Sequence, residues 1–174
     1  LALLAASSAL FGAESWSSFV AALAHHRDTI YGGGADPAYW GKIQSVFGAV
    51  RAAGGGGALA WAAQGGVGLA VAVVVSLAWS RPGRPAVKAA LLSAGALAVT
   101  PYQFAYDLAA IAIPAAFLVK DRIDTGPRPG EIPVAVAITV GLFAVLVWNR
   151  ALPLGPLLAL ALLALALRRE GVAG

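Results

Sequence analysis

Long apolar runs separated by short polar segments dominate the chain. The clearest run covers residues 55–79, and no charged residue interrupts the chain between Arg51 and Arg81. A helix needs about 20 largely apolar residues to cross the hydrocarbon core of a bilayer. This run therefore predicts a transmembrane helix, and four more apolar runs follow it, at 89–100, 106–119, 132–148 and 154–167.

The chain also opens inside an apolar run, 1–11, which no basic residue precedes. A signal peptide has a basic region before its apolar core. We therefore expect residues 1–12 to be the end of a transmembrane helix of a longer protein. With the runs above, about six passes are predicted. The fold class is all-α, a polytopic transmembrane helical bundle over 55–174 that follows an external, periplasmic segment over 13–54.

Composition supports residence in the lipid bilayer. Hydrophobic residues make up 60% of the chain, charged residues 11%, and the mean hydropathy is +0.80. Soluble domains carry about 25% charged residues because their surface faces water, so a soluble globular domain is excluded. The absence of cysteine excludes disulfides and thiolate chemistry. The net charge of +4 comes from basic residues scattered singly, which gives no reason to expect a nucleic-acid partner.

The basic residues between the apolar runs indicate an orientation. If every run crosses the membrane once, eight of them fall on one face, and the positive-inside rule makes that face cytoplasmic. We therefore predict a multi-pass protein of the inner (plasma) membrane with a cytoplasmic C-terminus. The eight residues are Arg81, Arg84, Lys88, Lys120, Arg122, Arg128, Arg168 and Arg169.

The segment 13–54 is too polar to span a membrane, and its pattern predicts two amphipathic helices. Ser15 is a candidate N-cap for the first helix, and Asp36 followed by Pro37 is typical of the start of the second. The apolar stripe of the first helix consists of Trp16, Phe19, Val20 and Leu23. That of the second lies within an arc of about 120° and consists of Tyr39, Trp40, Ile43, Val46, Phe47 and Val50.

These external helices are open to two interpretations. They brace the bundle at the membrane interface, or they offer a polar face to a ligand; the polar residues of the second helix are Lys42, Gln44, Ser45 and Arg51. The sequence His25-His26-Arg27-Asp28 does not predict a metal site. Adjacent helical side chains point about 100° apart, so both histidines do not reach one ion. Arg27 is a candidate phosphate contact instead.

A short hairpin around Pro101 carries an acidic residue. Only 31 residues separate Lys88 from Lys120, whereas two full crossings need about 40. The turn should therefore stop short of the outer surface, where its backbone groups need cover from protein or water. Asp107 then lies at membrane depth, beside Tyr102, Gln103 and Tyr106. It either caps the outgoing helix or pairs with an arginine, or it holds a substrate in a cavity.

Gln64 is a polar residue inside the clearest apolar run. It either faces the same cavity or makes a hydrogen bond between helices. The second interpretation is helped by a row of small residues that permits close helix packing: Ala58, Ala62, Gly66 and Ala70. The basic residues expected on the outer face would suit an anionic group such as a lipid phosphate; they are Arg27, Lys42, Arg51 and Arg150.

Several of these motifs, taken in order, resemble bacterial glycosyltransferase family 87. They are Tyr39-Trp40-Gly41-Lys42-Ile43-Gln44-Ser45-Val46-Phe47, Val50-Arg51 with the glycines after it, Trp61 with Gln64, Thr100-Pro101-Tyr102, and Tyr106-Asp107-Leu108. The resemblance covers roughly residues 16–118. Members are polytopic GT-C type enzymes related to polyprenol-phosphate-mannose-dependent α-mannosyltransferases.

The resemblance implies transfer of a mannose-like sugar from a polyprenyl-phosphate donor to a lipid-linked or envelope glycan acceptor on the outer face, with inversion and a carboxylate base. In GT-C enzymes that base typically lies in the first external loop, so we expect it upstream of Leu1, in a longer protein of which this is the C-terminal portion. No cofactor or metal is expected. Asp107 would organise the site, by orienting Lys42 or Arg51. The candidate substrate-binding residues are Lys42, Gln44, Ser45, Arg51, Gln64, Tyr102, Gln103, Tyr106 and Asp107.

Two non-enzymatic functions stay open from the sequence. One is a membrane transporter or assembly subunit with a polar cavity around Asp107 and a permeation path that includes Gln64. Paired broken helices in an inverted repeat would favour transport, but only the hairpin at Pro101 is broken in this way. The other is a scaffold whose external helices bind a partner protein.

Overall fold

The computed structural model describes residues 2–31, 37–147 and 153–171, and for residues 26–31, 37 and 38 it describes the backbone alone. Over these ranges the chain is helical, apart from an isolated antiparallel β-bridge between Ile43 and Phe104. The predicted all-α fold is confirmed. The chain forms two compact units, Leu1–Asp36 and Pro37–Gly174, so the division falls inside the predicted external segment.

The first unit consists of helix α1 (Ala2–Phe11) and helix α2 (Glu14–Tyr31). Gly12 separates them with a φ of 81°, a backbone conformation that glycine adopts without steric cost. The predicted N-cap at Ser15 is wrong, because α2 has already begun at Glu14. The Ser15 hydroxyl instead donates to the Gly12 carbonyl at 2.7 Å, which fixes the bend between the two helices.

The second unit begins with two short helices, α3 (Pro37–Trp40) and α4 (Val46–Ala52). One continuous helix was expected here, and that prediction is wrong. Ser45 is the reason: its backbone is extended (φ −130°, ψ 167°), and its hydroxyl accepts the Gly48 N–H, as an N-cap does. The apolar pattern nevertheless identified the buried side chains, since Trp40, Ile43 and Phe47 are each 1% exposed.

The predicted apolar runs correspond to the longer elements of this unit. Helix α5 matches the run 55–79, and the arm after Pro101 begins with a turn of 3₁₀-helix, η1. The arm before it extends further back than expected, to Pro85, a residue that suits the first turn of a helix. The elements are α5 (Gly57–Ser80), α6 (Pro85–Val99), η1 (Ala105–Ile111), α7 (Ala112–Thr125), α8 (Glu131–Val147) and α9 (Gly155–Glu170).

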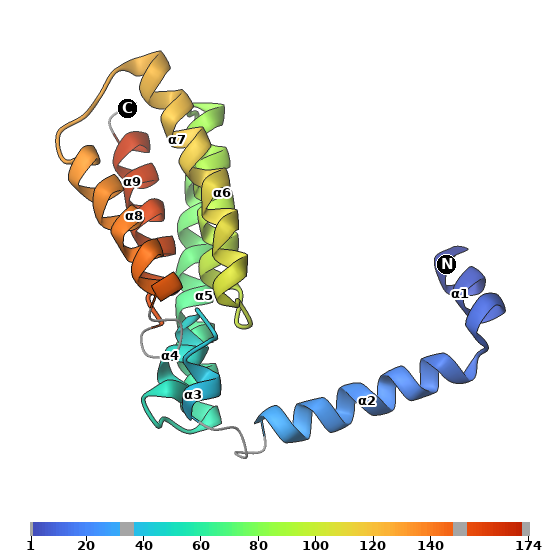
Figure 1. Ribbon diagram of the computed structural model, residues 1–174. Coiled ribbons are helices and arrows are strands. Elements are labelled where there is room, and N and C mark those ends of the chain that lie inside the picture. Colours follow the sequence, from blue (N-terminus) through green and yellow to red (C-terminus); the bar gives the residue numbers. More distant parts are fainter. Residues whose placement is uncertain (1, 32–36, 148–152, 172–174) are drawn as a thin grey trace. The chain divides into compact units, whose positions relative to one another are not determined.

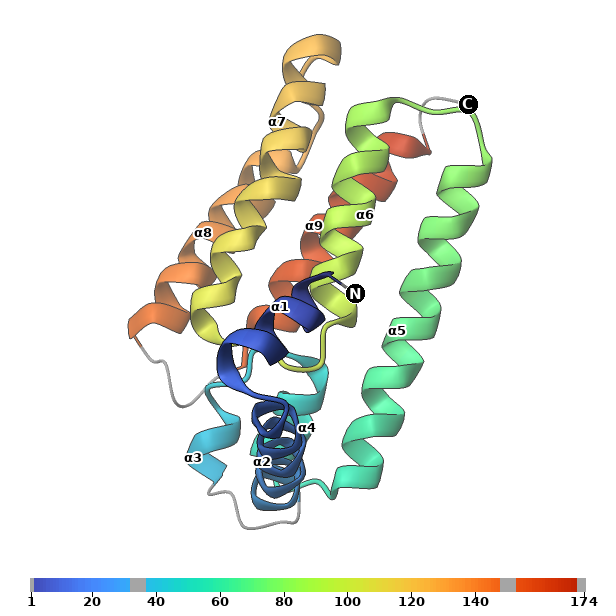
Figure 2. The ribbon, with the colours of Figure 1, turned by 90° about the vertical axis from the view of Figure 1, so that its right-hand side faces the viewer.

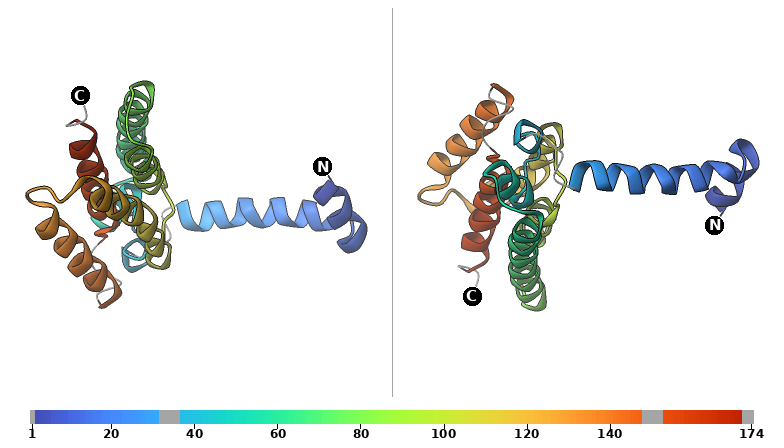
Figure 3. Two further views of the ribbon diagram at one scale, coloured as in Figure 1. Left: turned by 90° about the horizontal axis from the view of Figure 1, so that it is seen from above. Right: turned by 90° about the horizontal axis from the view of Figure 1, so that it is seen from below.

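Helix α6 lies at the centre of the bundle and packs against α5, α7 and α9, while α8 packs mainly on α9 (Figure 2). Viewed along the bundle, α5 and α8 lie on opposite sides (Figure 3). Small residues on α6 allow this close packing. A Cβ added at Gly95 would come within 3.1 Å of both Val71 and Val75 on α5.

The face of α5 that meets α6 differs from the predicted one. Ala58, Ala62, Gly66 and Ala70 are all exposed over the described residues, so the predicted packing role of this small-residue row is wrong. The buried residues of α5 are Ala60, Gln64, Val71 and Ala78. Small residues also occur on the buried face, at Ala60 and Ala78, so small residues alone could not identify the correct face.

Within the second unit the helix ends gather in two places (Figure 1). At one end, here called the basic end, meet the C-termini of α5, α7 and α9 and the N-termini of α6 and α8. The eight basic residues predicted to share a face all belong to these helix ends and the loops beside them, so that grouping is confirmed. At the other end, here called the turn end, α3 and α4 meet the 100–104 turn. Which side of a membrane each end faces stays a prediction.

Over the described residues, α5 is the helix with the length and composition to cross a membrane. Helices α6 and α8 are apolar but have 15 and 17 residues. At 1.5 Å per residue these lengths are about 22 and 26 Å, less than the ~30 Å of a hydrocarbon core. The prediction of about six spans therefore stays a prediction.

Candidate functional site

Gln64 on α5 joins the ends of two other helices at the turn end. Its side-chain oxygen accepts the N–H of Phe47, in the first turn of α4, at 3.0 Å. Its amide nitrogen donates to the carbonyls of Ala98 and Val99, in the last turn of α6, at 3.2 and 3.1 Å. Backbone groups at helix ends have no hydrogen-bond partner within their own helix. The Gln64 amide provides that partner for three such groups. The hydrogen bond expected between helices is confirmed.

The loop between α3 and α4 covers the 100–104 turn. The Ser45 hydroxyl donates to the Pro101 carbonyl at 2.5 Å, and the Gln44 N–H donates to the Gln103 carbonyl at 2.5 Å. The Ile43–Phe104 bridge continues this pairing. The expectation that protein covers the backbone groups of this turn is confirmed.

Gln44 also links this loop to α9. Its side-chain oxygen accepts the N–H of Gly155, the first residue of α9, at 3.1 Å, and its amide nitrogen donates to the Gly41 carbonyl at 3.1 Å. The helix start and the loop approach so closely that a Cβ at Gly155 would clash with the Gln44 carbonyl oxygen. A glycine is therefore required where α9 begins.

An aromatic cluster fills the space beside these polar contacts. The Phe47 ring lies 5.7 Å from Trp40, 4.9 Å from Trp61 and 5.5 Å from Tyr102, measured between ring centroids. The Arg51 guanidinium lies over the Trp40 ring at 4.7 Å and donates to the Gly55 carbonyl at 3.1 Å. This stacking holds a half-buried cation at the edge of the cluster.

The predicted site residues thus fall into two groups. Gln44, Ser45, Gln64 and Gln103 are buried, at 1–4% exposed, and the first three hold backbone groups in place. The Gln103 amide nitrogen has no hydrogen-bond partner over the described residues. The other group reaches the surface: Lys42, Arg51 and Tyr102 are half-buried, and Tyr106 and Asp107 are exposed. Binding of substrate by either group stays a prediction.

Asp107 lies at the start of η1 and behaves as a capping residue. Its carboxylate accepts the Phe104 N–H at 2.8 Å, which confirms the capping interpretation. Within the described ranges no ion pair joins it to Lys42 or Arg51, so the expected orientation of those cations by Asp107 is not present. Tyr106 beside it is 74% exposed and stacks on Phe104, with 5.4 Å between ring centroids.

A cluster of buried ions at the basic end was not predicted. Arg169, which is 2% exposed, donates to the Asp121 and Glu131 carboxylates at 2.5 Å each. Arg84 lies 3.1 Å from the other Asp121 oxygen. The hydrogen bonds from Arg169 lower the pKa of Glu131 below its ordinary value of 4.5. The sequence did contain a sign of this cluster: the acids Asp121 and Glu131 lie beside the basic residues from which the membrane orientation was predicted.

No group of three or more potential metal ligands occurs in the part of the chain that the structure describes. The side chains of His26, Arg27 and Asp28 lie outside it, as does Arg150. The described cations at the turn end, Lys42 and Arg51, can offset the charge of an anionic ligand, and the Asp107 carboxylate can accept a hydrogen bond from a hydroxyl. These groups permit binding of a phosphate or a sugar.

Comparison with protein-family models gives a match to glycosyltransferase family 87 over residues 1–101. The matched region includes the Tyr39–Gln64 motifs and Thr100-Pro101, and it ends before Tyr106-Asp107-Leu108. Comparisons with curated proteins and with solved structures gave no match. The family model covers more than half of the chain. The chain belongs to glycosyltransferase family 87.

Proposed function

We propose that this chain is part of an integral membrane glycosyltransferase that moves a mannose-like sugar from a polyprenyl-phosphate donor to a lipid-linked or envelope acceptor on the outer face of the plasma membrane. The family match over residues 1–101 is the observation that carries the proposal. The apolar helix α5 is compatible with a membrane enzyme, and a lipid-linked donor is the form of an activated sugar that such an enzyme meets in the bilayer.

In this proposal Lys42 and Arg51 bind the donor phosphate. One nitrogen of Arg51 donates a hydrogen bond to the Gly55 carbonyl, and the guanidinium lies over the Trp40 ring. A guanidinium carries five N–H donors in a planar fork, so others stay available for phosphate oxygens. Lys42 lies in the loop that pairs with the 100–104 turn, and it is half-buried. Both cations therefore belong to the turn end, opposite the eight basic residues of the basic end.

Tyr106 and Asp107 are proposed to contact a sugar hydroxyl or ring. One oxygen of the Asp107 carboxylate accepts a hydrogen bond from the Phe104 N–H, and the second oxygen accepts none from the described residues. The exposed Tyr106 ring beside it offers an apolar face. The buried residues Gln44, Ser45, Gln64 and Gln103 would then position the loops that carry these groups, as supporting residues rather than as direct contacts.

The chemistry proposed is a displacement at the sugar's anomeric carbon. An acceptor hydroxyl loses its proton to a carboxylate base and forms the new glycosidic bond, while the bond to the polyprenyl phosphate breaks and the phosphate leaves with the electron pair. Lys42 and Arg51 would stabilise the charge that develops on the departing phosphate. Asp107 is not proposed as the base, because its carboxylate is committed to capping η1.

The transporter alternative loses support from the contacts of Gln64. Both functional atoms of its amide are occupied by backbone groups of α4 and α6. A residue in a permeation path needs groups that exchange between ligand and water, whereas these bonds hold helix ends together. The observations therefore favour the transferase.

The test uses the full-length protein reconstituted in lipid, a panel of labelled polyprenyl-phosphate sugars, and an envelope lipid extract as acceptor. We expect a labelled lipid or glycan product with one of the donors, and a lower rate for the Asp107→Asn variant. The Ser93→Ala variant is a matched control, since Ser93 bonds only carbonyls of its own helix. No product from any donor with folded protein would refute the proposal.

A further inference from the structure

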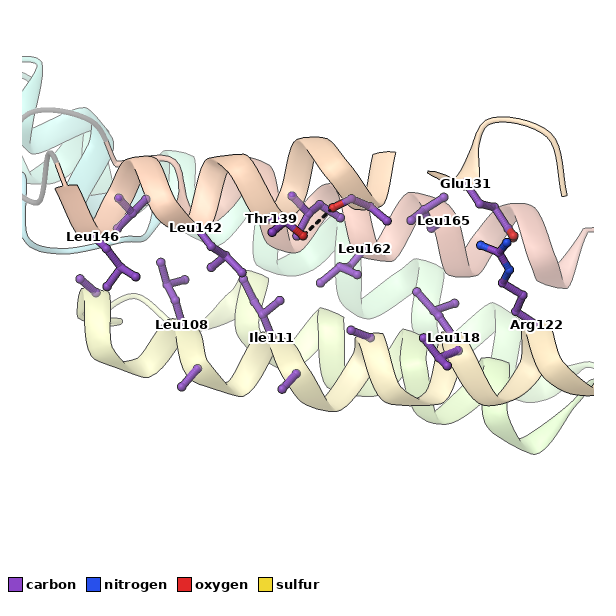
Figure 4. A pocket seen from close by; sticks show the side chains of 18 of the residues that line it. Leu108, Ile111, Leu118, Arg122, Glu131, Thr139, Leu142, Leu146, Leu162 and Leu165 are labelled. Carbon is purple, nitrogen blue, oxygen red and sulfur yellow. Dashed lines mark hydrogen bonds between the residues drawn. The ribbon is translucent and has the colours of Figure 1, made fainter. Parts of the chain in front are cut away.

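A long apolar groove runs between α7 and α8, with α9 as its floor (Figure 4). Its volume is about 480 Å³, within the range of small-molecule binding sites. Six of the apolar side chains on its wall come from η1, α7, α8 and α9: Ile111, Leu118, Ile138, Leu142, Leu162 and Leu165. Thr139 on its wall already donates to the Ala135 carbonyl. The other polar lining residues lie toward its two ends, Tyr106 at one and Arg122, Glu131 and Arg169 at the other, so the length between them offers mainly hydrocarbon contacts.

The groove ends in a surplus of positive charge at the basic end. Arg122 points from α7 toward Glu131 on α8 (Figure 4), and Arg169 also lines this end. Both oxygens of Glu131 already accept hydrogen bonds from Arg169. Over the described residues no hydrogen bond or ion pair involves the Arg122 guanidinium. Arg122 interacts electrostatically with Glu131. Because Arg84, Arg122 and Arg169 together face two carboxylates, those of Asp121 and Glu131, this group of side chains carries one net positive charge.

We propose that this groove binds one acyl chain of an anionic phospholipid, whose phosphate lies against Arg122 at the basic end. The length of the groove agrees with the thickness of the hydrocarbon region of one leaflet. From Arg122 to Ile111 the helix rises about 16 Å, close to the ~15 Å that half of a hydrocarbon core provides. The chain would lie along Leu118, Ile138 and Leu165 and reach Ile111. The groove continues to Ala105 and Tyr106 at the turn end, but the proposed lipid occupies only the part from Arg122 to Ile111, so the proposal does not depend on the transfer reaction.

A phospholipid fits these observations better than a polypeptide helix. A helix bound lengthwise in the groove would bury its apolar face, but it would not place a defined anion beside Arg122. A phosphate supplies that anion, and the surrounding basic end attracts it further: with the eight basic residues lie four acidic ones, Asp121, Asp124, Glu131 and Glu170. Each basic residue near an anionic lipid surface contributes about 1 kcal/mol to attraction.

The experiment measures lipid retained by the full-length protein after reconstitution in equal amounts of phosphatidylglycerol and phosphatidylcholine with matched chains, using native mass spectrometry. We expect preferential retention of phosphatidylglycerol. Arg122→Gln should lower that preference about fivefold, which corresponds to ~1 kcal/mol. Lys120→Gln is the charge control: Lys120 lies at the same end, outside the groove, in an exposed pair with Asp124, and its removal should change the preference less than twofold.

A second pair of variants tests the groove itself. Ala135→Trp fills the groove from an exposed position, whereas Ala137→Trp places the same ring on an exposed position of α8 outside it. Only the first should abolish retention. Equal retention of the two lipids, or equal effects of the members of either pair, would overturn the proposal. Absence of bound lipid together with cross-links between two protein copies across α7 and α8 would overturn it in favour of a protein occupant.

Discussion

Replacing Gln64 by leucine removes the amide that joins α4, α5 and α6 and leaves the volume of the side chain nearly unchanged. Three backbone groups lose their partner: the Phe47 N–H and the Ala98 and Val99 carbonyls. The bonds to Phe47 and Ala98 are buried, and each buried backbone group without a partner costs about 1–3 kcal/mol. The expected destabilisation is therefore about 2–6 kcal/mol, before any contribution from Val99.

The assay is thermal unfolding of the full-length protein in lipid nanodiscs, followed by tryptophan fluorescence. Trp40 and Trp61 both belong to the aromatic cluster around Phe47, so the signal reports on this region. For a domain of 150–250 residues each kcal/mol shifts the midpoint by about 2–4 °C, which predicts a decrease of at least ~4 °C.

Ser93→Ala provides the comparison for this variant. It also deletes a polar group from a helix of the bundle, but Ser93 bonds only the carbonyls of Ala89 and Ala90 in its own helix. Its midpoint should change little. If Gln64→Leu unfolds at the same temperature as Ser93→Ala, the amide does not hold the helix ends together, and the description of the turn end is refuted.

Three further predictions concern contacts at the two ends of the bundle. Gly155→Ala should destabilise the protein by about 1–3 kcal/mol, the range for overpacking, because the added Cβ meets the Gln44 backbone; an unchanged unfolding midpoint would contradict the close approach. Arg169→Met should cost about 3–5 kcal/mol, since it leaves two carboxylates without their buried guanidinium; the unfolding midpoint measures the loss, and a neutral result would refute the ion cluster. Because Arg169 lowers the pKa of Glu131, the stability that Glu131 contributes is present above its ordinary pKa and is lost as the pH falls through the lower, folded-state pKa. The midpoint should therefore fall as the pH is lowered below about 4.5, the ordinary pKa of this carboxyl, and Glu131→Gln should reduce this dependence.

The sequence predicted the helices well where apolar composition alone decides them. The run 55–79 became α5, and the basic residues between the runs gather at one end because short loops return the chain to that end. The sequence also indicated that the backbone groups of the turn at Pro101 need cover, from protein or from water. It could not show what supplies the cover, because the contacts between Ser45 and Pro101 and between Gln44 and Gly155 join segments that are far apart in the chain.

The errors came from positions where local chemistry and helical periodicity disagree. The apolar arc from Tyr39 to Val50 fitted a helix, but the Ser45 hydroxyl capped a new helix at Val46 and ended the periodic pattern. The Asp121–Arg169–Glu131 cluster was missed for a different reason. Its residues lie far apart in the chain, and only the packing of α7, α8 and α9 brings the two acids around one guanidinium.

We propose above that Lys42 and Arg51 at the turn end of this family 87 protein bind the substrate phosphate. The most direct test of this proposal is the rate of labelled sugar transfer by the full-length protein and its Lys42→Gln variant, with Lys120→Gln at the basic end as the charge-matched control. We expect a rate at least tenfold lower for Lys42→Gln, equivalent to ~1.4 kcal/mol of transition-state stabilisation, and an unchanged rate for Lys120→Gln. Equal rates for the two variants would contradict it.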